Sequence, residues 1–210
     1  MRYIGGKSLL LDNISNVIDS YTANVSTVID LFAGSGVVSE HLKKSGFRTI
    51  SNDFLFFSYA IQRGTIGLNR KPTFKKLGIS NPLDYLNALK LEDTDFRLEQ
   101  CFIYNNYTPT GDCSRMYFQP DNALKIDIIR LTIEKWYNKA MIDEDEYFYL
   151  LSCLINAVPY VSNITGVYAA YLKFWDTRTY NELTLVEPTI IDNGYNNECY
   201  NEDYTSLLDT

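Results

Sequence analysis

The chain has 210 residues, of which 46% are hydrophobic, and this is enough for one globular core with a smaller insertion. Nineteen Lys and Arg against 26 Asp and Glu give a formal net charge of −7, which excludes attraction of the whole molecule to nucleic-acid phosphates. Any nucleic-acid contact therefore needs a local basic face.

The cysteine pattern and the first residues indicate the compartment. The four cysteines have no CxxC spacing and the chain contains one histidine, a pattern that favours a reduced protein without a His/Cys metal site. The N-terminus is too polar for a signal peptide, and no apolar run approaches the roughly 20 residues that span a bilayer. We expect a soluble, cytoplasmic protein without membrane contact.

The first third of the chain has the pattern of a β-α-β unit. Apolar residues recur at helical spacing over residues 8–21, which predicts an amphipathic helix. The β-rich run 27–32 predicts a strand, and residues 37–44 predict a helix that Gly46 closes. A second short strand is expected within residues 47–53.

The rest of the chain is less regular. Residues 64–100 lose their periodicity, which predicts loops and short helices, and the Tyr, Asn, Pro and Gly density of residues 103–125 predicts an ordered but irregular loop. Helices are expected at 123–139 and 144–157. The tail fits a short third strand at 198–201 and the first turn of another helix.

The turn after the first predicted strand has the parts of a nucleotide-binding loop. In Asp30–Gly36 (DLFAGSG) a strand leads into glycines that permit close backbone approach to a ligand at a helix N-terminus. Gly-x-Gly alone is weak evidence, but Asp53 follows at the end of the second strand, where a carboxylate can accept both ribose hydroxyls. The alternative is a tight turn beside a surface aspartate.

Five motifs in order resemble the Dam-like adenine-specific DNA methyltransferases. The opening motifs are YIGGK at 3–7, DLFAGSGVVS at 30–39 and ND at 52–53. The stretches SRMYFQPDNALKIDIIR (114–130) and SNITGVYAAYLKFW (162–175) look like that family's DNA-recognition insertion. The resemblance implies an α/β, Rossmann-like S-adenosylmethionine-dependent methyltransferase fold with a partial sheet and a mostly helical recognition insertion, in the alpha-type motif order.

The same resemblance implies a division of the chain and an open sheet. The cofactor-binding core would comprise residues 1–63 and 190–210, and the target-recognition insertion residues 64–189. In the family's strand order, 3-2-1-4-5-7-6, this chain supplies only strands three, two and one. The first strand would then have an unpaired edge.

The resemblance also implies contacts to S-adenosylmethionine. Tyr3 would pack beside the cofactor, Lys7 would lie near the methionine carboxylate and the active site, and Asp53 would hold the ribose. Phe54 would cover the adenine ring, and Asp203 resembles an acidic position close to that ring. The alternatives are a core ring for Tyr3 and a helix cap for Asp203. The complete set of implied cofactor contacts is Tyr3, Lys7, Asp30, Phe32, Gly34, Gly36, Asp53, Phe54 and Asp203.

Candidate contacts to double-stranded DNA follow from the recognition motifs. Arg can bind phosphates, Asn can pair with adenine edges, and an aromatic ring can fill the space left by a flipped base. For each candidate taken singly, a structural or phosphate-positioning role is favoured over base reading. The candidates are Arg115, Tyr117, Asn122, Tyr160, Asn163, Thr165 and Tyr168. A basic group at residues 70–76 could be a phosphate patch or a solvated face.

The family's catalytic tetrapeptide, Asp-Pro-Pro-Tyr, does not occur in the sequence, in which no two prolines are adjacent. We therefore expect no catalytic residue in this chain and no activity by the chain alone. The expected function is the cofactor-binding and DNA-recognition portion of a restriction-modification DNA adenine-N6 methyltransferase. A C-terminal methyltransferase fragment or self-association would complete the sheet. The alternative is a non-catalytic DNA- or cofactor-binding remnant.

Overall fold

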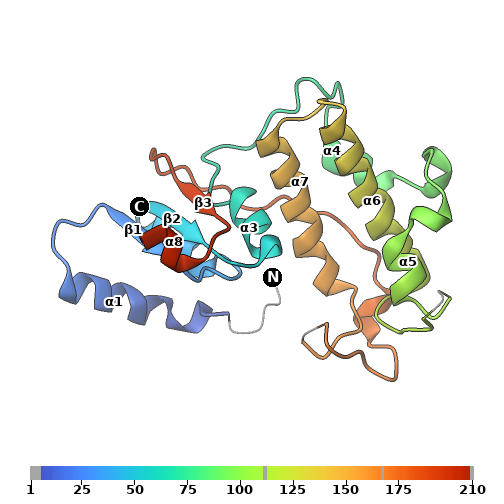
Figure 1. The fold of residues 1–210 in the computed structure, drawn as a ribbon, viewed down its shortest axis with the longest axis horizontal. Helices are drawn as coiled ribbons and strands as arrows, with labels where there is room; N and C mark the ends of the chain where they lie inside the picture. The colour runs from blue at the N-terminus through green and yellow to red at the C-terminus, as the bar shows by residue number, and fades with distance from the viewer. Residues whose placement is uncertain (1–5, 111–112, 167, 209–210) are drawn as a thin grey trace. The chain divides into compact units, whose positions relative to one another are not determined.

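The structure of the protein, a computed structural model, describes residues 6–110, 113–166 and 168–208. The chain divides into two compact units. The α/β unit contains residues 5–73 and 188–210, and the helical unit contains residues 74–187 (Figure 1). Each unit has its own secondary structure and its own buried side chains.

A parallel three-stranded sheet is the centre of the α/β unit. Its strands lie in the order β1-β2-β3, which confirms the predicted order. Ile29 lies opposite Ile50, which in turn lies opposite Glu198. In the described part of the chain, β1 pairs only with β2, so its other edge has no strand beside it. The bounds of the strands are β1 (Thr27–Asp30), β2 (Arg48–Asn52) and β3 (Glu198–Tyr200).

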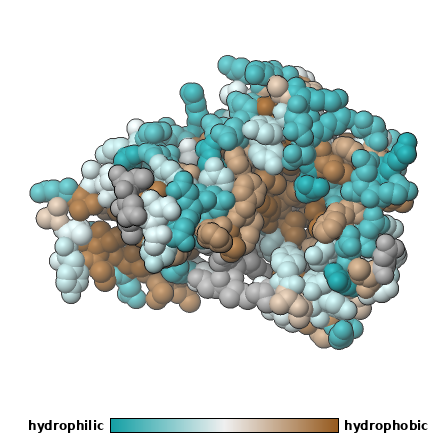
Figure 2. All heavy atoms as spheres, viewed as in Figure 1, coloured by the Kyte–Doolittle hydropathy of each residue, from teal (hydrophilic) through white to brown (hydrophobic). Residues whose placement is uncertain are grey.

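The helices of the α/β unit differ in how many of their side chains are buried. α2 packs against β1 and β2, and α3 packs against β3. α1 has no buried residue, and a 2.7 Å hydrogen bond between Ser15 Oγ and His41 Nε2 ties it to α2. Figure 2 shows apolar side chains gathered at the surface along α1. The bounds are η1 (Ser8–Leu10), α1 (Leu11–Tyr21), α2 (Val37–Lys44), α3 (Phe56–Arg63) and α8 (Tyr204–Leu208).

Residues 64–73, which the sequence analysis assigned to the insertion, pack on the α/β unit. Lys43 on α2 is 1% exposed, and its Nζ donates hydrogen bonds to the carbonyls of Ile66 at 2.9 Å and Leu68 at 2.5 Å. Asn69 Nδ2 donates to the carbonyl of Tyr195 at 2.7 Å. These contacts explain why the helical unit begins at residue 74 rather than at 64.

The helical unit is built on two long antiparallel helices in its centre, α6 and α7, and α6 also packs against α5. Its largest fully buried apolar side chains include Ile128, Ile129, Ile133, Leu150 and Leu183. No helix in the described residues is long and apolar enough to cross a membrane. The bounds are α4 (Pro82–Ala88), η2 (Leu91–Asp93), η3 (Leu98–Gln100), α5 (Phe102–Tyr107), α6 (Pro120–Asn138), α7 (Glu144–Ala157), η4 (Val158–Tyr160) and η5 (Thr177–Tyr180).

The expectation of irregular structure from residue 103 onwards is wrong at its start, where α5 forms. No side chain of its own sequence neighbourhood caps this helix. Instead, the carboxylate of Asp127 on α6 accepts hydrogen bonds from the backbone N–H groups of Ile103 at 3.1 Å and Tyr104 at 2.8 Å. Because a helix leaves its first N–H groups without an intrahelical partner, a carboxylate 24 residues away supplies the cap that stabilises the start of α5.

Candidate functional site

The turn between β1 and α2 is held against the end of β2. Gly34 and Gly36 have φ angles of 55° and 78°, which are left-handed values that favour glycine. The Gly34 N–H donates a 2.7 Å hydrogen bond to Asp53 Oδ2. Ser39 Oγ donates a 2.7 Å hydrogen bond to Asp30 Oδ2 at the end of β1. The glycines and the two aspartates named from the sequence therefore meet at the carboxyl ends of adjacent parallel strands, where α/β sheets bind ligands.

The Asp53 carboxylate keeps acceptor capacity for a ligand. Besides the Gly34 bond, its Oδ1 accepts the Leu55 N–H at 2.9 Å. A carboxylate offers about four lone-pair positions, so two remain for hydroxyl groups. The preceding residue, Asn52, is 1% exposed; its Nδ2 donates to the carbonyls of Leu31 and Glu202, and its Oδ1 accepts the Glu202 N–H. Asn52 thus joins the ends of β1, β2 and β3.

An exposed aromatic ring follows the carboxyl end of each of β1 and β2. Phe32 is 63% exposed, with its ring centroid 5.2 Å from that of Tyr204, and Phe54 is 75% exposed. Asn201, which the sequence analysis did not single out, donates from Nδ2 to the carbonyls of Asp53 at 2.8 Å and Phe54 at 3.0 Å. The exposed rings offer flat apolar surfaces of the kind that cover a purine.

Two buried polar atoms on α3 lie one helical turn apart. Ser58 and Gln62 are both fully buried, and Ser58 Oγ and Gln62 Oε1 have no hydrogen-bond partner among the described residues. Gln62 Nε2 donates a long 3.4 Å hydrogen bond to the Gly34 carbonyl, and a side chain at Gly36 would meet Gln62 Cγ at 3.6 Å. Neither residue was predicted from the sequence, because residues 56–63 were not predicted to form a helix.

The remaining candidates for cofactor contact are Lys7, Asp203 and Tyr3, and the structure gives no hydrogen bond between either of the described residues Lys7 and Asp203 and the glycine turn. Lys7 is exposed directly before η1. Asp203 is exposed, and its Oδ1 accepts hydrogen bonds from the N–H of Thr205 at 2.9 Å and from that residue's hydroxyl at 2.5 Å. These bonds hold the pKa of Asp203 below its ordinary value and stabilise the start of α8. Tyr3 lies outside the described residues.

The seven candidate DNA contacts divide into two groups. Tyr117, Asn122 and Asn163 are buried, and hydrogen bonds within the helical unit occupy their polar atoms. Asn122, for example, donates to the carbonyls of Thr179 and Asn181 and accepts the Leu183 N–H. The other four are exposed: Arg115, Tyr160, Thr165 and Tyr168.

Comparison with known proteins places the chain in a family. A family model described as D12 class N6 adenine-specific DNA methyltransferase matches residues 3–210. The chain belongs to this family. No solved structure gives a significant match.

Several methyltransferases of curated identity are similar to this D12-class chain. It is 45% identical to the type II methyltransferase M.FokI of Planomicrobium okeanokoites, a match that covers 100% of the chain and 32% of M.FokI. It is 46% identical to the modification methylase StsI of Streptococcus sanguinis over 99% of the chain and 31% of that protein. The match to M.NlaIII of Neisseria lactamica is 33% identical and covers 99% of the chain and 60% of M.NlaIII. The chain therefore spans between 31% and 60% of the length of these relatives.

Membership of the D12 class implies S-adenosylmethionine as the methyl donor, and the α/β unit contains residues that fit it. Gly34 and Ser35 in the turn are partly exposed, and Asp53 has unused acceptor positions. The exposed ring of Phe54 directly follows Asp53, and that of Phe32 lies two residues after Asp30. The buried, unpaired oxygens of α3 below the turn are a further polar feature of this site.

Proposed function

We propose that the chain is the S-adenosylmethionine-binding and DNA-recognition portion of a site-specific DNA adenine-N6 methyltransferase. The observation that carries the proposal is the hydrogen bond from the Gly34 N–H to the Asp53 carboxylate, which joins the glycine turn to the acidic end of β2. The family match over residues 3–210 supports the same reaction class.

In the α/β unit, each element would have a separate task in cofactor binding. The backbone of Phe32–Gly36 would lie against the methionine part, with Lys7 near its carboxylate, and Asp53 would accept the ribose hydroxyls. Phe54, which Asn201 holds in place through its carbonyl, would cover the adenine ring. When bound, the cofactor supplies an electrophilic methyl group on a sulfonium centre, so the chain must position groups rather than provide an acid or base.

We assign recognition of double-stranded DNA to the helical unit. Its exposed candidates are an arginine, a threonine and two tyrosines, which suit phosphate contact, groove contact and base stacking. The net charge of −7 makes such local contacts necessary. The buried candidates, Tyr117, Asn122 and Asn163, would support this surface from below.

We further propose that the chain does not transfer a methyl group by itself, because the family's Asp-Pro-Pro-Tyr tetrapeptide is absent from its sequence. The missing groups would come from a C-terminal methyltransferase segment that pairs with β1, and self-association would cover the same edge. The unpaired backbone edge of β1 offers hydrogen-bond partners to such a segment, and the 51% exposed side chain of Ile29 leaves apolar surface on a face of the sheet for it to cover.

Calorimetry with S-adenosylmethionine tests the cofactor site. Asp53→Ala should weaken binding about tenfold or more, because it removes the ribose acceptors and releases the glycine turn. Asp19→Ala, which removes an exposed carboxylate on α1, should leave binding unchanged and serves as the matched control. Equal affinity of the two variants would remove Asp53 from the site.

A second assay separates the catalytic portion from the non-catalytic alternative. Tritiated cofactor and mixed-sequence DNA are incubated with the chain alone and with the chain plus the C-terminal portion of M.NlaIII. Activity only in the mixture supports the proposal, and activity of the chain alone would show that another segment replaces the tetrapeptide. Cofactor binding without activity in either case would favour the non-catalytic module.

A further inference from the structure

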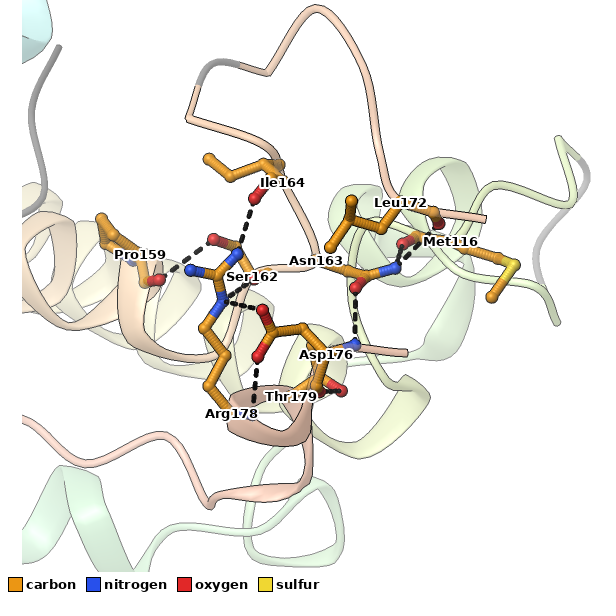
Figure 3. Close-up of polar contacts among 9 residues, drawn as sticks. All are labelled: Met116, Pro159, Ser162, Asn163, Ile164, Leu172, Asp176, Arg178 and Thr179. Atoms are coloured by element: carbon orange, nitrogen blue, oxygen red, sulfur yellow. Dashed lines mark hydrogen bonds and ion pairs between the residues drawn. The ribbon is translucent and has the colours of Figure 1, made fainter. Parts of the chain in front are cut away.

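The loop of residues 164–172 in the helical unit is fixed at both ends by side chains that lie outside it. At its start, Arg178 Nη2 donates a 2.6 Å hydrogen bond to the Ile164 carbonyl (Figure 3). At its end, Asn163 Nδ2 donates a 3.1 Å hydrogen bond to the Leu172 carbonyl. We call the described residues of this loop, 164–166 and 168–172, the clamped loop, and Asn163 and Arg178 the clamp.

The two clamp residues belong to one partly buried hydrogen-bond network. Arg178 Nε donates to the Ser162 carbonyl at 2.8 Å and lies 3.8 Å from Asp176 Oδ2, which balances its charge. Asp176 in turn donates its N–H to Asn163 Oδ1 at 3.0 Å, and Asn163 Nδ2 also reaches the Met116 carbonyl at 2.9 Å. Figure 3 shows these side chains converging below the loop. Asn163 is fully buried and Arg178 is 17% exposed, so removing a partner of either would leave poorly hydrated polar groups unpaired.

The middle of the clamped loop is exposed but supported. Thr165 and Tyr168 are both exposed, the latter at 46%. Tyr117, buried beneath, donates from its hydroxyl to the Tyr168 carbonyl at 3.0 Å, and the two rings stack with centroids 6.4 Å apart. Thr165 and Tyr168 are therefore accessible to solvent, and the contacts with Tyr117 hold Tyr168 in position.

Two cations lie over tyrosine rings in the segments around the loop. Lys173 Nζ lies 4.6 Å from the Tyr171 ring centroid, and Arg115 lies 5.7 Å from that of Tyr107. Neither cation forms an ion pair with another residue that the structure describes. Exposed cations held by aromatic rings are suited to phosphate contact.

We propose that the clamp makes Asn163 and Arg178 positioning residues for DNA sequence discrimination, and that Lys173 and Arg115 contact phosphates beside the clamped loop. This inference rests on the proposed DNA-binding function. Base reading requires a fixed register of the reading groups, whereas phosphate contact is independent of sequence. The two kinds of residue therefore affect two different measurements.

The test uses the full chain and a pool of duplexes of about 30 base pairs with a randomised centre of about ten. Sequences that wild type enriches are compared with scrambled duplexes by fluorescence anisotropy at several salt concentrations. The affinity ratio measures discrimination, and the slope of log affinity against log salt measures phosphate contacts.

Asn163→Asp and Arg178→Gln should lower the affinity ratio about tenfold with little change in the salt slope. Each removes the side-chain hydrogen bond at one end of the loop and leaves the ends joined by the backbone bond from the Leu172 N–H to the Asn163 carbonyl. Lys173→Gln should weaken binding to all duplexes and reduce the slope by about one, with the ratio unchanged. Asn138→Asp and Lys139→Gln, at exposed positions at the end of α6, are the matched controls. A merely destabilised variant has fewer folded molecules, which lowers apparent affinity for every duplex equally and leaves the ratio intact.

The possible outcomes distinguish failure of the proposed DNA-binding function from failure of the positioning role of the clamp. If wild type binds no duplex, the DNA-binding function and this inference both fail. If wild type binds without enriching any sequence, or if both clamp variants keep the wild-type ratio, the inference fails while DNA binding stands. An unchanged salt slope in Lys173→Gln would remove that lysine from the phosphate contacts.

Discussion

The α/β unit and the helical unit bury different kinds of side chain. In the helical unit, isoleucine and leucine side chains from α6 and α7 are fully buried against each other. In the α/β unit, buried polar side chains outnumber buried apolar ones among the described residues; they include Ser39, Lys43, Thr49, Ser51, Asn52, Ser58, Gln62 and Asn197. Meanwhile Val17, Ile29 and Phe32 of this unit are exposed.

This difference indicates that the two units are stabilised by different interactions. Apolar burial is the main stabilising contribution in the helical unit. The α/β unit instead uses hydrogen bonds to fix its strand ends, and its exposed apolar groups leave stabilisation to be gained from a ligand or a further strand. Both tryptophans, Trp136 and Trp175, lie in the helical unit, so their fluorescence reports its unfolding, and hydrogen exchange of β2 amides reports the α/β unit.

The largest expected effect is on the apolar core. Ile129→Ala removes a fully buried side chain from α6 and should lower the free energy of unfolding of the helical unit by about 2–5 kcal/mol. Ile29→Ala, the same change at a 51% exposed position of β1, should cost less than about 0.5 kcal/mol. Urea unfolding followed by the two probes measures both. A similar loss of unfolding free energy in the two variants would contradict the difference in apolar burial between the two units.

A pH effect should come from the polar core of the α/β unit. Burial lowers the pKa of Lys43 from 10.5 to about 8. Between these values the unfolded chain binds more protons than the folded chain, so the free energy of unfolding rises with pH across this window, by up to about 3 kcal/mol. Below about pH 8 both states are protonated and the cost of burying the charge is fully present.

Lys43→Met supplies the control for this pH effect, because it keeps the length of the side chain without the titrating group. Protection of β2 amides in wild type should rise relative to Lys43→Met from pH 8 to 10.5. Parallel pH profiles would show that Lys43 keeps an ordinary pKa in the folded chain.

A smaller effect is expected where the helical unit depends on a polar contact. Asp127→Ala removes the acceptor of the first N–H groups of α5 and should cost on the order of 2 kcal/mol. Asp121→Ala, an exposed carboxylate on the same helix, is the control. Loss of tryptophan-detected stability in Asp127→Ala alone would show that the helical unit also contains an essential polar contact.

The smallest expected effect concerns a local cap. Asn81 Oδ1 accepts the Leu83 N–H at 3.2 Å at the start of α4, so Asn81→Ala should cost about 1 kcal/mol. Ser80→Ala beside it, at an exposed position, should be neutral. A cost equal to that of Ile129→Ala would mean that α4 contributes more to the helical unit than its one cap.

Local patterns in the sequence were sufficient to predict most of the strands and one of the helices that form the centre of the α/β unit. The helix predicted at residues 37–44 has those bounds, and the strands predicted at 27–32 and 198–201 form β1 and β3, each slightly shorter. The pairing of the glycine turn with Asp53 could also be anticipated. Strand, turn and helix signals are carried by neighbouring residues, and parallel strands bring their carboxyl ends to one edge.

Only the tertiary structure decided the rest, because the deciding partners lie far apart along the chain. α5 depends on Asp127, and residues 64–73 are held by Lys43. The sequence named Asn163 and Thr165 alike as DNA candidates, yet the structure buries the first in a hydrogen-bond network and exposes the second. A side chain's type determines which bonds it can make, and the packing of distant segments determines which of those bonds remain for a ligand.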